Sequence, residues 1–231
     1  MSIQTESLKR PDTLHIFDGE LGQLHSALLE LSDLLMYQVE QAMHAFDFGD
    51  LELALKVIAR NKKVDHLSRQ IDAEMETALL EHYPSGKDLI RVLSSGRIAS
   101  ELDKIGDTMV EFSRLTINFF EAKTDTPPVD QALETLRMIG RLRIMLDKVT
   151  VALETQDSHP AYSLLAYVRQ FDNDARQALR DNLGAARLVE HNPMALTLLQ
   201  LMEVLYRCGG HCGKVAEYLI FMLDGKDIRH S

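Results

Sequence analysis

Cys208, His211 and Cys212 lie within five positions of one another and are the first candidates for chemistry, since they include both cysteines of the chain. Thiolate and imidazole are zinc ligands, but the cysteine pair needs two further ligands to complete a tetrahedral site. The sequence supplies no second Cys or paired-His motif, only single histidines such as His191 or His230. A disulfide is disfavoured, because Cβ atoms four residues apart on a helix are separated by about 5–6 Å, against about 3.8 Å in a disulfide. Two free thiols agree with a reducing compartment.

Asp103, Asp107 and Glu111 form a second candidate group. At 100° per residue, steps of four residues drift by only about 40°, so the three carboxylates form one narrow stripe on a helix. Their mutual repulsion costs a few tenths of a kcal/mol per pair. A cation that prefers carboxylate oxygen, such as Mg²⁺, Ca²⁺, Mn²⁺ or iron, would relieve it. The spacing is equally compatible with a solvated acidic face.

The two candidate groups fall in corresponding parts of an apparent internal repeat. The stretch VDHLSRQID at 64–72 matches FDNDARQAL at 171–179, and LDKIGDTMVEF at 102–112 falls on LYRCGGHCGKV at 205–215. The offsets are 107 and 103 residues, and a shorter start to the last helix absorbs the difference. An internal duplication is the simplest explanation.

The repeat changes the interpretation of the cysteines. Cys208 takes the position of Ile105, and Cys212 takes that of Met109. Because a free cysteine behaves as a small hydrophobe, we expect both thiols in the core rather than in a reactive site.

The repeat also shows that the acidic stripe is lost from the second copy. Its positions there are Tyr206, Gly210 and Lys214. A metal site, if present, is therefore expected only in the first half. Gly106 corresponds to Gly209, which predicts a close helix approach belonging to the fold, whereas the additional glycines predict a smooth surface for packing.

Apolar residues recur at steps of three and four almost throughout, which predicts an all-α fold. We expect a first helix from Leu21 that ends in FDFGD (46–50) with Gly49 as its stop, and a third that Ser85 or Asp88 caps. Pro127 and Pro128 separate two halves. A second helix is expected over about Leu51–His82 and a sixth over about Met194–Leu223. Inward residues mark the others: Leu89 to Phe119 in the third, Leu136 to Leu153 in the fourth, which QDSHP (156–160) closes, and Leu165 to Ala178 in the fifth, which ends before EHNP (190–193). The prediction is two tandem three-helix bundles, at residues 1–125 and 126–231.

Composition narrows the function classes. The 231 residues include 35 acidic and 25 basic side chains, a formal charge of −10 that disfavours binding to nucleic acid or an anionic membrane. Neither a signal-peptide pattern nor an apolar run of membrane-spanning length is visible, so we expect a cytoplasmic protein. A carboxylate-bridged metal oxidase is disfavoured, because such bundles use Glu-x-x-His motifs and this sequence has none.

The stretch ELDKIGD at 101–107 resembles the acidic signature of the PhoU family of phosphate-uptake regulators, usually Glu-Arg-Ile-Gly-Asp, with Lys104 as a conservative departure. FDGEL at 17–21, Pro84 followed by DL at 88–89, and GKDIRH at 225–230 are also similar to PhoU elements and occur in the expected order. The resemblance covers nearly the whole chain.

This resemblance implies three-helix bundles that carry metal on acidic motifs. Here it leaves one iron or other divalent or trivalent metal site in the first half, at Asp103, Asp107 and Glu111. It also implies a negative regulator of phosphate uptake and of the phosphate-starvation response, without catalysis of its own. Such an adaptor couples the ATPase of a phosphate ABC importer to a sensor histidine kinase, is peripheral to the membrane only through its partners, and frequently forms homodimers.

Two alternatives stay open. One is a metal-binding or metal-buffering helical protein that uses the acidic stripe. The other is a diverged PhoU-like paralogue that regulates a different transporter, which the altered second motif YRCGG at 206–210 allows.

Overall fold

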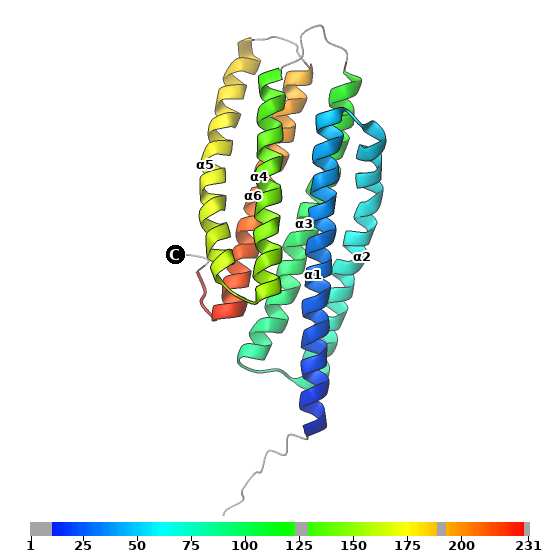
Figure 1. The fold of residues 1–231 in the computed structure, drawn as a ribbon, viewed down its shortest axis with the longest axis vertical. Helices are drawn as coiled ribbons and strands as arrows, with labels where there is room; N and C mark the ends of the chain where they lie inside the picture. The colour runs from blue at the N-terminus through cyan, green and yellow to red at the C-terminus, as the bar shows by residue number, and fades with distance from the viewer. Residues whose placement is uncertain (1–10, 123–128, 189–192, 229–231) are drawn as a thin grey trace, which may run out of the picture.

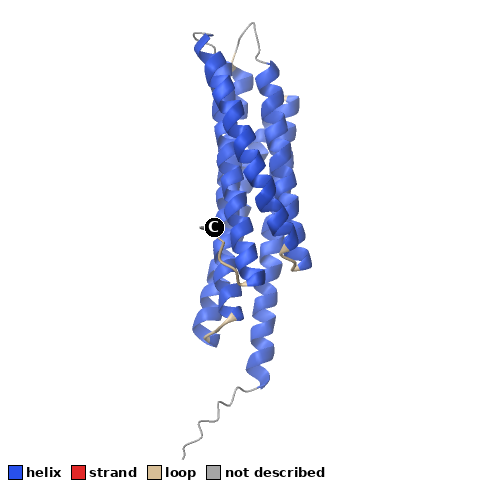
Figure 2. Cartoon of the chain, turned by 90° about the vertical axis from the view of Figure 1, so that its left-hand side faces the viewer, coloured by secondary structure: helices blue, strands red, loops and turns tan. Residues whose placement is uncertain are grey.

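A computed structural model describes residues 11–122, 129–188 and 193–228. All regular structure in these ranges is helical (Figure 2), which confirms the all-α prediction. The six helices are α1 (Pro11–Phe48), α2 (Leu51–His82), α3 (Lys87–Glu121), α4 (Val129–Thr155), α5 (His159–Leu188) and α6 (Pro193–Asp224). The expected ranges are correct for α2 and close for α6, and α4 and α5 end before QDSHP and EHNP as expected. Helices α1, α4 and α5 begin before the first inward residue that marked each of them.

Glycine and aspartate set the boundary between α1 and α2. Gly49 follows α1 with φ +66°, a left-handed conformation that costs glycine little. Asp50 then caps α2, its Oδ1 accepting a hydrogen bond of 2.9 Å from the backbone N–H of Leu53. The predicted stop at Gly49 is therefore correct, and the same turn also starts the next helix.

The predicted cap of α3 is wrong. Neither Ser85 nor Asp88 occupies the N-cap position, which belongs to Gly86, and no side chain caps the helix there. Gly86 has φ +59°, a backbone conformation that serine rarely adopts, and Asp88 already lies inside the first turn.

The helices form two three-helix groups that lie side by side, α1–α3 and α4–α6 (Figure 1). Helix α1 packs against α4, and α3 packs against α6. Both pairs are antiparallel. Ser32 contacts Thr150 while the later Glu40 contacts the earlier Arg143, and Glu101 contacts His211 while the later Glu111 contacts the earlier Arg207. Within the described ranges, α2 contacts only α1 and α3, and α5 contacts only α4 and α6. Each inner helix thus meets its own counterpart in the repeat.

The core is one continuous cluster that runs through all six helices. Leu31 and Leu35 of α1, Phe112 of α3 and Leu142 and Leu146 of α4 are fully or almost fully buried within it. Apolar burial of this kind is the main driving force for folding, so the two halves stabilise each other as well as themselves. The predicted boundary at 125/126 lies outside the described residues, and the division into two domains stays a prediction.

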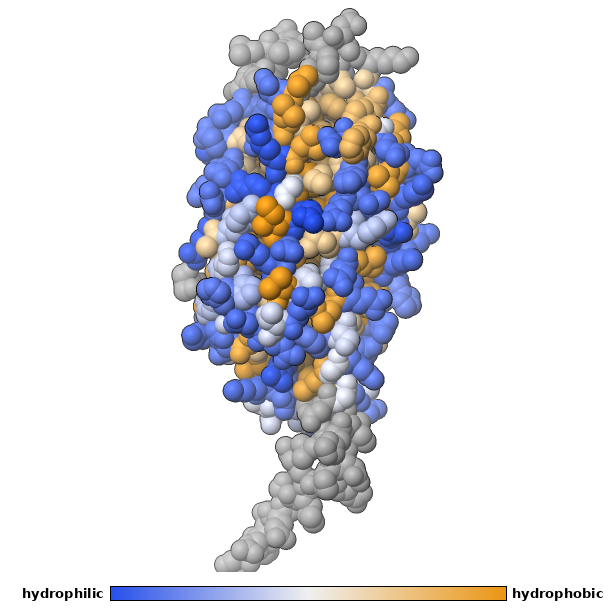
Figure 3. Space-filling view, viewed as in Figure 1, coloured by the Kyte–Doolittle hydropathy of each residue, from blue (hydrophilic) through white to orange (hydrophobic). Residues whose placement is uncertain are grey.

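The face seen in Figure 3 is largely hydrophilic, with apolar residues most visible toward its upper end. Large exposed apolar side chains include Phe48, Val129 and Leu133. No described helix combines the length and the apolar character that crossing a membrane requires.

Candidate functional site

The acidic motif of α3 faces α2, where the structure adds acids from that helix. Asn61 of α2 donates from Nδ2 to Oδ1 of Asp65 at 3.1 Å and to Oδ1 of Asp107 at 3.0 Å. Its own Oδ1 accepts a hydrogen bond of 3.1 Å from Gln38 of α1. One buried amide therefore connects α1, α2 and α3 and holds two carboxylates toward the same surface.

Asp103 is the most perturbed member of this surface. Burial raises the pKa of its carboxyl, and the negative charges of Asp107, Asp65 and Asp72 raise it further, with Arg69 acting in the opposite direction. Its Oδ1 is shielded from solvent, and no hydrogen-bond donor among the described residues reaches it. We call Asp65, Asp72, Asp103 and Asp107 the acidic face of α2 and α3. Such a concentration of carboxylates favours the approach of a cation.

Glu111 does not join the acidic face. It is exposed and forms an ion pair of 2.5 Å with Arg207 of α6. The carboxylates of Asp103, Asp107 and Glu111 do not gather within 4.8 Å of one another. Among the described residues only Glu20, Glu81 and His82 do so. Metal binding at Asp103, Asp107 and Glu111 stays a prediction. In the structure, Asp103 and Asp107 lie near residues of α2 rather than near Glu111.

Glu101, the first residue of the motif, is a site residue that the sequence analysis missed. Its side chain is only 7% exposed, and its two oxygens lie 2.7 Å from Lys104 Nζ and 2.7 Å from His211 Nδ1. Lys214 Nζ is 3.9 Å away. Burial alone would raise the pKa of Glu101, but the hydrogen bonds from His211 and Lys104 outweigh it and lower the pKa to about 2. One signal for a charged contact was present in the sequence, because the repeat places the cation Lys214 at the position that the acid Glu111 occupies in the first copy.

The second copy keeps the arrangement of the acidic face but has lost the two acids of α3, Asp103 and Asp107. Tyr206 lies beside Asp172 and Arg176 of α5, with the Arg176 guanidinium 5.6 Å from the centre of the Tyr206 ring. These two residues are the repeat counterparts of Asp65 and Arg69, which surround Asp103 in the first copy. The structure thus supports the register of the repeat at this point.

Both cysteines are core residues, as the repeat predicts. Cys208 and Cys212 have no exposed surface and form no disulfide. Burial raises the pKa of the Cys208 thiol to about 12 and that of Cys212 well above its usual value. Sγ of Cys208 lies 2.7 Å from Oγ1 of Thr108, so the thiol belongs to the contact between α3 and α6. Neutral, buried thiols do not suit a redox or zinc switch. The other histidines considered for such a site, His191 and His230, lie outside the described residues.

Glycine at 106 and 209 serves close helix approach in both copies, as expected. A Cβ added to Gly106 would lie 3.0 Å from Val64 and 2.7 Å from Asn61 Oδ1 of α2. One added to Gly209 would lie 2.5 Å from the ring of Phe171 of α5, and Phe171 is the repeat counterpart of Val64. The two additional glycines of α6, Gly210 and Gly213, differ from each other in how closely a neighbouring helix approaches them.

Gly213 is buried, and a Cβ there would lie 3.2 Å from Val168 of α5. A Cβ at the exposed Gly210 would meet no atom within 4 Å. The predicted packing against a neighbouring helix is therefore confirmed at Gly213, whereas Gly210 meets no described helix and contact with a partner there stays a prediction.

Comparison with known proteins supports this architecture. Residues 28–116, which include the acidic motif, match the PhoU domain family model. The chain is 28% identical over 234 residues to a "phosphate-specific transport system accessory protein PhoU homolog" of Pseudomonas putida, covering 99% of this chain and 88% of the relative. It is 25% identical over 219 residues to the PhoU protein of Escherichia coli, covering 93% and 88% respectively.

Solved structures agree over both halves of the molecule. The crystal structure of PhoU from Pseudomonas aeruginosa superposes with a TM-score of 0.83 at 24% identity, covering 91% of this chain and all of the other. PhoU from Streptococcus pneumoniae gives a TM-score of 0.82 at 22% identity, covering 92% and 99%. These likenesses establish the fold. Together with the domain match at residues 28–116 and the relatives aligned along nearly the whole chain, they show that this chain is similar to PhoU proteins in sequence and in fold.

Proposed function

We propose that this protein is a regulatory accessory protein of phosphate transport, without catalytic activity of its own. The observation that carries the proposal is the similarity along nearly the whole chain to proteins named as accessory components of the phosphate-specific transport system. An accessory role requires association with transporter components, and a protein with no catalysis of its own acts through its surfaces.

In the finer form of the proposal, the protein acts in the cytoplasm as a negative regulator. It couples the ATPase of a phosphate ABC importer to a sensor histidine kinase, reaches the membrane only through these partners and forms a homodimer. The supporting feature is the long rod of six helices, which offers each half a separate outer helix, α2 or α5 (Figure 1).

The test is co-purification of the protein with the importer ATPase and with the sensor kinase, from cells grown at high and at low phosphate. We expect both partners to be retained at high phosphate. A deletion strain should activate a phosphate-starvation reporter at high phosphate. Retention of neither partner under both conditions, together with a silent reporter in the deletion strain, would reject the adaptor.

A second candidate is modulation or buffering by metal at the acidic face. It is favoured by the mutual repulsion of Asp103, Asp107, Asp65 and Asp72, which a cation would relieve. Elemental analysis of protein purified without chelator should show metal in the wild type and a loss in Asp103→Ala/Asp107→Ala. Unchanged metal content in the double variant would exclude these two residues as ligands.

A diverged paralogue that serves another transporter is the remaining alternative, and Tyr206, Gly210 and Lys214 support it because they remove the acids from the second copy. A complementation test separates it from the main proposal. Expression of this protein in a strain lacking its own PhoU should restore repression of the phosphate-starvation reporter. Failure to restore it, despite normal expression, with capture of a different transporter ATPase, would favour the paralogue.

A further inference from the structure

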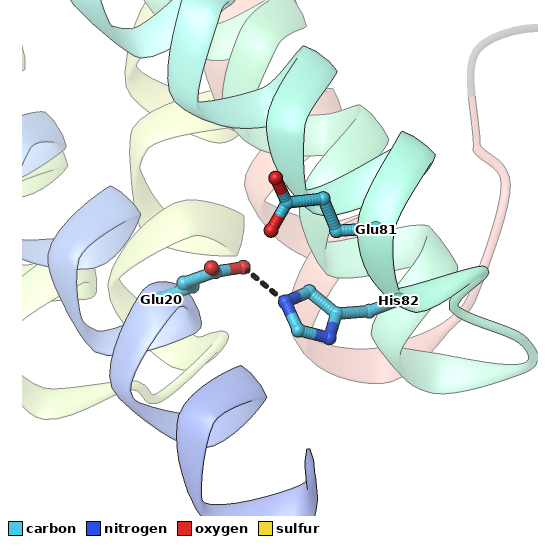
Figure 4. Close-up of side chains that lie close together, drawn as sticks. All are labelled: Glu20, Glu81 and His82. Atoms are coloured by element: carbon cyan, nitrogen blue, oxygen red, sulfur yellow. Dashed lines mark ion pairs between the residues drawn. The ribbon is translucent and has the colours of Figure 1, made fainter.

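A cluster of three potential metal ligands lies away from the acidic face, where the lower part of α1 meets the end of α2. Glu20 comes from α1, and Glu81 and His82 come from the last turn of α2 (Figure 4). Each offers one ligand atom, and these three atoms all lie within 4.8 Å of one another. Among the described residues, no other set of three histidine, cysteine or acidic side chains meets this distance.

The two central side chains are well enclosed. His82 Nε2 lies 2.8 Å from Glu20 Oε2, and the side chains are only 12% and 24% exposed. Both of these atoms are shielded from solvent. Glu81 lies beside this pair (Figure 4) and is exposed, so an ion can reach the cluster from solvent.

The backbone holds this cluster in place from two directions. Helix α2 ends at His82, and Tyr83 follows in the left-handed conformation with φ 48°, after which the chain turns into α3 at Lys87. Glu20 approaches from α1, which packs against both α2 and α3. The ligands are therefore presented by two helices and a tight turn rather than by one mobile loop.

The charges of the cluster favour a divalent cation. Two ionised carboxylates share the space with one imidazole, which balances at most one of them when protonated. A net negative charge of one or two therefore remains, and a doubly charged ion neutralises it. Mixed imidazole and carboxylate ligands suit transition ions such as Zn²⁺, Mn²⁺ and Fe²⁺, and a three-ligand set leaves a position for water.

The distances are compatible with a metal after a small adjustment. Bonds of about 2.0–2.2 Å in tetrahedral geometry place neighbouring ligand atoms about 3.3–3.5 Å apart. The His82 and Glu20 atoms, now 2.8 Å apart, would need to separate by well under 1 Å. The exposed Glu81 side chain would swing inward by somewhat more, which its rotatable bonds allow.

From these observations we propose that Glu20, Glu81 and His82 form a binding site for a divalent transition-metal ion that clips α1 to the turn between α2 and α3. The site is separate from the acidic face. Asp72, the member of the acidic face nearest to it on α2, lies ten residues before His82 (72 to 82), which corresponds to about 15 Å along the helix. An ion bound only by the folded state stabilises it by mass action, so the clip tightens the fold as metal concentration rises.

The test uses the full-length chain, freed of affinity tags and of metal, titrated with Zn²⁺ by calorimetry. The informative variant is Glu81→Gln, because it removes one ligand and leaves the Glu20–His82 contact intact. Glu20→Gln and His82→Gln each remove a buried ligand. We expect each variant to bind Zn²⁺ at this site more than about tenfold more weakly, since losing even a partner of a ligand costs 10- to 100-fold.

The matched control is Asp103→Asn/Asp107→Asn, which removes charge from the acidic face and should leave this Zn²⁺ site unchanged. Thermal melting gives a second measurement, in which Zn²⁺ should raise the Tm of the wild type and of the control by more than that of Glu81→Gln. If Glu81→Gln, verified as folded by circular dichroism, binds Zn²⁺ as the wild type does, the proposal is wrong and the cluster is an ion pair between helices only. Loss of Zn²⁺ binding in the control alone would also overturn it, by placing the ion on the acidic face.

Discussion

The acidic motif of α3 (101–111) and its counterpart on α6 (204–214) have the same backbone role and opposite surface chemistry. Both present a glycine to the neighbouring outer helix, Gly106 toward Val64 and Gly209 toward Phe171. Yet the surface of α3 carries Asp103 and Asp107, whereas α6 has Tyr206 and Gly210 at those positions. The positions that fix the distance between helices are kept, and those that face solvent have changed.

The two motifs also contact each other, which explains part of the change. Antiparallel packing of α3 on α6 places Glu101 beside His211 and Lys214, and Glu111 beside Arg207. The cations of α6 thus pair with acids of α3, on either side of the Thr108–Cys208 contact. The second copy has exchanged a repeated acidic surface for electrostatic complementarity to the first.

Removal of the buried carboxylate at this contact should have the largest effect. We expect Glu101→Gln to lower the free energy of unfolding by about 2–3 kcal/mol near neutral pH, because His211 and Lys104 lose their charged acceptor. The pKa of Glu101 is about 2 in the folded state and 4.5 in the unfolded state. Its stabilising contribution is therefore complete above pH 4.5 and disappears as the pH falls toward 2.

Urea denaturation from pH 7 down to pH 2 measures this difference. The exposed Glu111→Gln is the control on the same helix, and its effect should be far smaller. A constant difference between Glu101→Gln and wild type across that pH range would show that the carboxylate charge is not responsible.

Substitution of Gly209, the counterpart of Gly106 in the repeat, should have the next largest effect on stability. Gly209→Ala should destabilise the protein by about 1–3 kcal/mol, because its Cβ would lie 2.5 Å from the buried Phe171 ring. Gly210→Ala, one residue further on the same helix, should stabilise it by about 0.5–1 kcal/mol, since nothing lies within 4 Å and alanine is the better helix former. Thermal or urea unfolding compares the two. Equal effects of both substitutions would contradict close packing at Gly209.

The acidic face should respond in the opposite sense to loss of charge. The folded pKa of Asp103 is raised above its ordinary value of 3.8, so its ionised form opposes folding at neutral pH. We expect Asp103→Asn to stabilise the protein by about 0.5 kcal/mol at pH 7, with the gain disappearing below pH 3.8. The same comparison with added Mn²⁺ should favour the wild type if the face binds metal. If Asp103→Asn is less stable than the wild type at pH 7 without metal, repulsion between Asp103 and the neighbouring carboxylates does not destabilise the folded protein.

The exposed pair between the two motifs should contribute least. Glu111 and Arg207 are 49% and 45% exposed, so their ion pair is screened by solvent. A double-mutant cycle with Glu111→Gln and Arg207→Gln should give a coupling energy of a few tenths of a kcal/mol, decreasing with salt. A coupling above about 2 kcal/mol would mean that this pair, rather than the Glu101 cluster, holds the motifs together.

Helical periodicity predicted most of the fold because it depends on local chemistry. Heptad-like apolar spacing located all six helices, and Gly49 marked the end of α1. The cap of α3 was missed because Gly86 enters the N-cap with positive φ, a conformation that composition does not reveal. The earlier starts of α1, α4 and α5 were missed because the regularly spaced apolar residues that marked each helix begin after its first residue.

The candidate site was predicted in part. Asp103 and Asp107 do share a surface, but Asn61, Asp65 and Asp72 of α2 complete it, and Glu111 turns instead to Arg207. Helical spacing relates residues of one helix to each other and says nothing about which side chains of another helix face them. The same reason explains why the cluster of Glu20, Glu81 and His82, sixty residues apart in the chain, was not visible in the sequence.

The sequence by itself determined the all-α class, the internal repeat, the burial of Cys208 and Cys212, and the loss of acids from the second copy. Each of these follows from residue type and spacing within one helix or from comparison of two stretches. Only the tertiary structure decided that α3 and α6 pack antiparallel, so that His211 and Lys214 lie beside Glu101. That pairing depends on the relative direction and register of two helices a hundred residues apart, which long-range packing of the shared core sets.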